Sequence, residues 1–85
     1  MNGPALLEHA ASLVTRRRRE YGEPEDLFDQ VARRWSLTLG THVSPAQVVL
    51  CLIDLKLARL VRDPKHLDSQ VDVAGYVAVL REVTR

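Results

Sequence analysis

Apolar residues recur along this chain at intervals of three and four, the spacing that places them on one face of an α-helix. Prolines stand at the starts of three such segments, where a proline fits the first helical turn. The pattern predicts four helices, over residues 4–19, 24–39, 45–62 and 68–83. No segment alternates apolar and polar residues as a strand does. We therefore predict a single all-α domain over residues 1–85.

The links between these segments contain residues that are typical of helix ends. A turn is predicted at residues 20–22, and Gly40 ends the second helix. Residues 44–47, Ser-Pro-Ala-Gln, form a capping box that begins the third helix, and Asp-Pro at 63–64 ends it. The link that follows is short, so the third and fourth helices are expected to form an antiparallel pair. The predicted architecture is a compact four-helix bundle.

The third predicted helix is apolar around nearly its whole circumference, as expected of a central helix or an interface helix. Hydrophobic residues make up 46% of the chain, yet only 5% are aromatic, so aliphatic surface is abundant. A chain of 85 residues buries a smaller fraction of its surface than a larger domain does. We therefore expect homodimerisation to complete the bundle.

Charge and cysteine content narrow the cellular setting. The formal net charge of +1 gives no overall attraction to nucleic acid or to an anionic membrane. The run Arg16–Arg19 points in several directions on a helix, so a solvated helix end is preferred to a nucleic-acid site. Cys51 is the single cysteine, which suits a reducing compartment. The longest apolar run, 48–53, is too short to span a bilayer, and no signal-peptide pattern begins the chain. We expect a cytoplasmic protein with no membrane partner and no nucleic-acid partner.

Charged residues are rare in the middle of the third helix, where they are Asp54, Lys56 and Arg59. Lys56 and Arg59 are three residues apart and therefore point to the same side. If the chain turns near residue 65, the antiparallel pairing sets Arg59 level with Asp72, Lys56 with Gly75, and Asp54 with Tyr76. These side chains are thus predicted to form one patch on two facing apolar helices.

Two interpretations of this patch remain open. In the structural one, Asp68 or Ser69 caps the fourth helix and Arg59 neutralises Asp72 in an ion pair. In the functional one, Asp68 and Asp72 lie on successive turns and hold Mg²⁺, while the two cations contact phosphate. Gly75 favours the second, because a glycine inside a helix costs about 1 kcal/mol relative to alanine. Either a close helix contact or a ligand should justify that cost.

Four segments together resemble a group of small phage and actinobacterial proteins of unknown function: Y-G-E-P-E-D-x-F, A-x-x-W-S, L-x-x-L-K-x-A-R-L and H-x-D-S-x-x-D-x-A-G-Y. The resemblance covers residues 7–80. That group is distantly similar to the MazG-like, all-α nucleoside triphosphate pyrophosphohydrolases and to phage nucleotide-modification-associated domains. The resemblance implies a MazG-like bundle that uses Mg²⁺ to split a nucleoside triphosphate into monophosphate and pyrophosphate, in the host cytoplasm if phage-encoded.

The resemblance also implies roles for single residues. Lys56 and Arg59 would be catalytic and would hold phosphates. The metal ligands would be Asp68 and Asp72, and the set would be completed by Asp54 or by carboxylates of the second helix, Glu25, Asp26 and Asp29. The remaining substrate-binding residues would be Tyr21, Gly22, His66 and Tyr76. The enzymes carry an E-x-x-E motif on the helix before the aspartates, where this chain offers only Asp54. Two alternatives therefore stand beside catalysis: a protein that binds a nucleotide without turnover, and a structural or regulatory partner.

Overall fold

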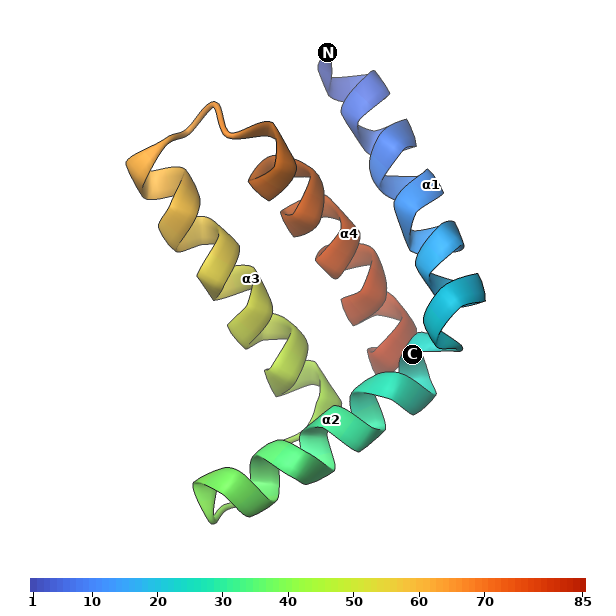
Figure 1. Ribbon diagram of the computed structural model, residues 1–85, viewed down its shortest axis with the longest axis vertical. Coiled ribbons are helices and arrows are strands. Elements are labelled where there is room, and N and C mark those ends of the chain that lie inside the picture. Colours follow the sequence, from blue (N-terminus) through green and yellow to red (C-terminus); the bar gives the residue numbers. More distant parts are fainter.

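Three of the four helices lie side by side and the remaining one crosses their end (Figure 1). The structure, a computed structural model, describes residues 1–85 and contains α1 (Gly3–Tyr21), α2 (Pro24–Leu39), α3 (Pro45–Arg62) and α4 (Leu67–Thr84), with no strand. In the figure α4 lies between α3 and α1, and α2 runs across the lower ends of the layer. The predicted all-α fold with four helices is confirmed.

The helix ends follow the capping residues closely. The bounds of α2 and α3 agree with the prediction, and both hydrogen bonds of the Ser44–Gln47 capping box are present. The first helix is longer than predicted at both ends. It begins at Gly3, because the side chain of Asn2 accepts a hydrogen bond from the backbone N–H of Ala5. It continues to Tyr21 and stops at Gly22, whose φ of 87° is a conformation that favours glycine.

The start of α4 differs from the prediction, because His66 is its N-cap. The Nδ1 atom of His66 accepts a hydrogen bond from the backbone N–H of Ser69 at 3.3 Å and lies 2.7 Å from the Ser69 hydroxyl. The prediction that Asp68 or Ser69 caps this helix is therefore wrong. Asp72 consequently lies beyond the first turn and has no capping role.

The core is small and lies where α2 crosses α3 and α4. It is built on five buried residues: Phe28, Ala32, Val43, Val48 and Val49. Only 10 of 85 residues are buried, and no leucine is among them. The leucines of this chain are thus partly or largely exposed to solvent. No helix is both long enough and apolar enough to cross a membrane.

Candidate functional site

A cavity of about 350 Å³ lies where the end of α1 and the start of α2 meet the middle of α3 and α4. The surrounding residues are cationic, aromatic and aliphatic side chains with one carboxylate and two glycines: Val14, Arg17, Arg18, Tyr21, Gly22, Pro24, Leu27, Phe28, Lys56, Asp72, Gly75, Tyr76 and Val79. All four helices contribute to it. This cavity is called the main cavity below.

Asp72 is the single carboxylate of the main cavity and it contacts two cations. The Nζ atom of Lys56 lies 3.0 Å from Oδ2 of Asp72, and Nη2 of Arg17 lies 3.8 Å from Oδ1. The side chains of Lys56 and Asp72 are only 14% and 19% exposed. A charge that is shielded in this way requires a partner, and Asp72 provides it for Lys56.

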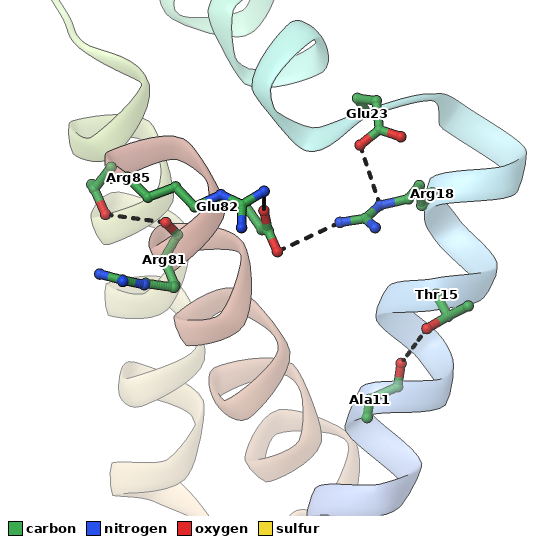
Figure 2. A network of polar contacts seen from close by, with 8 residues as sticks. Ala11, Thr15, Arg18, Glu23, Arg81, Glu82 and Arg85 are labelled. Atoms are coloured by element: carbon green, nitrogen blue, oxygen red, sulfur yellow. Dashed lines mark hydrogen bonds and ion pairs between the residues drawn. The ribbon is translucent and has the colours of Figure 1, made fainter.

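Arg18 holds the rim of the main cavity together. Its Nε atom lies 3.3 Å from Glu23 at the start of α2, and its Nη2 atom lies 3.6 Å from Glu82 on α4. Figure 2 shows the guanidinium of Arg18 between these two carboxylates. Arg85 lies 3.1 Å from the other oxygen of Glu82. One arginine therefore links three helices next to the opening.

Aromatic rings and glycines shape the remaining walls. Tyr76 is half-buried and lies four residues after Asp72 on α4, while Tyr21 at the end of α1 is 65% exposed. Phe28 closes the cavity toward the core. Gly75 is buried, yet a Cβ atom placed on it would meet only Val14 Cγ2, at 3.7 Å. Close helix packing therefore does not require glycine at this position.

A second hollow lies beside the main cavity, between α1 and α4. Its lining includes His9, Arg16, Asp68 and, shared with the main cavity, Arg17 and Asp72. Asp68 and Asp72 thus lie on the same surface, one helical turn apart, as the sequence suggested. The two hollows meet at the Arg17–Asp72 ion pair.

The predicted site residues separate into those that converge and those that do not. The main cavity brings together Tyr21, Gly22, Lys56, Asp72 and Tyr76. Three others lie elsewhere. Arg59 and His66 line a separate depression with Arg62 and Asp63, and Asp54 is exposed and lines none of the three hollows described.

The predicted pairing of Arg59 with Asp72 is corrected by the structure, in which Lys56 occupies that place. Lys56 lies three residues before Arg59, nearly one helical turn earlier on α3, and its ammonium is the group that contacts Asp72. The predicted level of Arg59 rested on a turn at residue 65. The link comprises residues 63–66, and α4 begins one residue earlier than predicted, at Leu67.

Sequence analysis missed Arg17 and Arg18, which both line the main cavity. The arginine run was expected to point in several directions, and it does: three of its members contact different partners. The sequence signal for these two arginines is their spacing from Tyr21. Tyr21 was assigned to the site, and residues three and four positions before it lie on the same side of the helix.

The carboxylates of the chain do not form a complete metal site by themselves. No group of three or more His, Cys, Asp or Glu side chains lies close enough together to hold a metal ion. Asp68 and Asp72 line one hollow, and Asp54 does not line it. Two carboxylates are nevertheless a usual number for Mg²⁺ when substrate phosphates supply further ligands. By themselves, Asp68 and Asp72 do not complete the coordination of a metal ion.

The fold and the site define this protein as an all-α chain with a cation-lined cavity among its helices. Within this class, the chain belongs to the family described as "Domain of unknown function (DUF6378)", whose model matches residues 5–84. This confirms the expected membership of a family of unknown function.

Two relatives come from mycobacterial viruses. The chain is 32% identical over 81 residues to the Gene 55 protein of Mycobacterium phage L5, covering 93% of this chain and 52% of that protein. It is 31% identical over 80 residues to the Gene 55 protein of Mycobacterium phage D29, covering 93% and 53%. The chain thus spans about half the length of these relatives. No solved structure matches it.

Proposed function

We propose that the protein binds a nucleotide in the main cavity, with phosphate beside Lys56 and Arg17 and the base near the tyrosines. The observation that carries this proposal is that Lys56 and Arg17 share the single lining carboxylate, Asp72, in a cavity with aromatic and aliphatic walls. The third lining cation, Arg18, is already paired with Glu23 and Glu82. Phosphate is recognised by Arg and Lys donors, and a base packs against aromatic rings. The volume lies at the lower end of the range for small-molecule sites.

The ion pairs around Asp72 support an exchange of partners on binding. In the structure, Asp72 neutralises Lys56 at 3.0 Å and Arg17 at 3.8 Å. A phosphate group offers the same cations more oxygen acceptors and more negative charge. It takes the place of the Asp72 carboxylate next to Lys56, so that the shielded ammonium never lacks a counter-ion.

In this proposal a longer polyphosphate extends from the main cavity into the second hollow. The two hollows share Arg17 and Asp72, and the second adds Arg16 and Asp68. This geometry favours a second candidate function, the Mg²⁺-dependent splitting of a nucleoside triphosphate that the MazG-like resemblance implies. Asp68 and Asp72 would hold a metal ion that the substrate brings. Homodimerisation and a cytoplasmic location, in the host cell if phage-encoded, belong to the same proposal.

Isothermal titration with nucleoside mono-, di- and triphosphates, each with and without Mg²⁺, tests binding. Lys56→Met removes the ammonium but keeps the chain length, and it should weaken binding at least about tenfold, or about 1.4 kcal/mol. The matched control is Arg59→Met, which removes a cation from the same helix outside the main cavity. Its affinity should stay within about twofold of that of the unchanged protein.

Product analysis on the same samples separates the candidate functions. Release of pyrophosphate only with Mg²⁺ supports the enzyme, and saturable binding without products supports the nucleotide-binding protein. Equal losses of affinity in the Lys56 and Arg59 variants would move the phosphate site away from the main cavity. No binding of any nucleotide would overturn the proposal and leave a structural or regulatory role.

A further inference from the structure

The outer side of α3 is an apolar surface that no other part of the chain covers. Leu50, Leu57 and Val61 are 48%, 44% and 85% exposed. They follow one another at helical spacing, and the small residues Cys51 and Ala58 beside them are exposed as well. This surface, residues 50, 51, 54, 57, 58, 61 and 62, is called the outer face of α3. Asp54 is its one carboxylate, and Arg62 lies at its end.

The chain exposes more surface area to solvent than a compact monomer of its mass does. The chain exposes 6048 Å², whereas a compact monomer of its mass exposes about 5,100 Å². The excess of roughly 900 Å² is close to the ~800 Å² that each partner buries in a standard protein interface. The radius of gyration points the same way: it is 13.6 Å, against about 12 Å for a compact domain of this length.

We infer that the outer face of α3 packs against the same face of a second copy, with the two α3 helices antiparallel about Ala58. A two-fold interface requires a surface that complements itself. Asp54 and Arg62 lie four residues before and after Ala58, so antiparallel packing brings Asp54 of one copy to the height of Arg62 of the other. The small side chain of Ala58 lets the two helices approach closely at the centre.

Self-association in another orientation is less favourable on charge grounds. A parallel arrangement would set Asp54 beside Asp54 and Arg62 beside Arg62, and like charges that face each other destabilise a contact. In the antiparallel arrangement Asp54 of one copy faces Arg62 of the other, once at each end of the contact. The main cavity, formed on the opposite side of α3 by Lys56 and the other helices, stays open.

Sedimentation equilibrium of the full chain tests this inference. At micromolar concentration, the mass should be twice the 9.6 kDa of one chain. Val61→Glu places a charge in the interface and should yield a folded monomer. Leu37→Glu is the matched control, because Leu37 is also 85% exposed but lies on α2. That variant should remain a dimer.

A charge exchange tests the antiparallel arrangement separately. Asp54→Arg and Arg62→Asp should each weaken the dimer, and the double variant Asp54→Arg/Arg62→Asp should restore it at least in part. The mass of the double variant is measured without any nucleotide. The result therefore does not depend on whether the protein binds nucleotides. A monomer at every concentration would overturn the inference. A dimer that Leu37→Glu disrupts and Val61→Glu preserves would overturn it too.

Discussion

On the inner face of α3, Val49 is fully buried, and Lys56, a charged side chain, meets Asp72 at 3.0 Å. On the outer face of the same helix, Leu50 and Val61 are 48% and 85% exposed. The inner face is complete within one chain, because each shielded group on it has a partner. The outer face has the composition of a buried surface and lacks anything to cover it.

This contrast explains why the third helix resembles an interior helix in the sequence although it lies at the edge of the layer. Its apolar residues surround it because its own chain covers one side, and we propose that a second copy covers the other. Burial of apolar surface is favourable whichever molecule provides the covering. Inspection of the sequence alone therefore identifies the helix as unusually apolar but does not separate the two uses.

Introducing an aspartate on each face should give the largest difference between them. Val49→Asp buries an unpaired charge, and it should cost several kcal/mol, enough to unfold most of a domain with marginal stability. Leu50→Asp changes the next residue, on the exposed side, and should cost each monomer no more than about 1 kcal/mol. Helicity measured by circular dichroism during urea unfolding makes the comparison. Both changes are placed in the Val61→Glu variant, so that loss of the proposed dimer does not add to the cost of Leu50→Asp. Similar losses in both variants would mean that the two faces are not distinct.

Neutralising Asp72 tests whether a phosphate ligand binds at the inner face of α3. Asp72→Asn frees Lys56 and Arg17 from their carboxylate, so Mg²⁺-free phosphate ligands should bind about tenfold more tightly, a gain of about 1.4 kcal/mol. If a metal ion bridges Asp72 and the phosphates, the same variant should lose Mg²⁺-dependent binding instead. Titrations with and without the metal distinguish these results. An affinity unchanged in both conditions would show that the ligand does not approach Asp72.

Much of the fold was predictable from local signals. The bounds of α2 and α3 follow from Pro24, Gly40 and the Ser44 capping box, because these residues act through neighbouring backbone groups. The cap of α4 was not predictable in the same way. Histidine is not among the usual capping residues, and Ser69 offered a familiar pattern three positions later. The structure shows His66 in that role.

The site was predictable only to the extent that one helix determines it. Gly75, Tyr76 and Asp72 share α4, and all three line the main cavity as expected. The cation opposite Asp72 depends on how two helices slide along each other, and the sequence placed Arg59 where Lys56 lies. Hydrophobic periodicity specifies which side of a helix is buried and leaves its axial position open by about one turn.

Gly75 provides the smallest and most diagnostic change, because stability and binding should move in opposite directions. A Cβ at this position would meet Val14 Cγ2 at 3.7 Å, an ordinary contact. Gly75→Ala should therefore stabilise the chain by about 0.5–1 kcal/mol through helix propensity. The new methyl group also narrows the floor of the main cavity, so nucleotide affinity should fall a few-fold.

The matched control is Ala78→Gly, at an exposed position of the same helix nearly one turn further on. It should lower the free energy of unfolding by a similar amount and leave affinity unchanged, which calibrates helix propensity in α4. Urea unfolding and nucleotide titration of both variants complete the comparison. A gain in stability with weaker binding means that glycine keeps the cavity open for a ligand. A loss of stability in Gly75→Ala would mean that α1 and α4 need glycine for packing, and the argument for a ligand from this residue would fail.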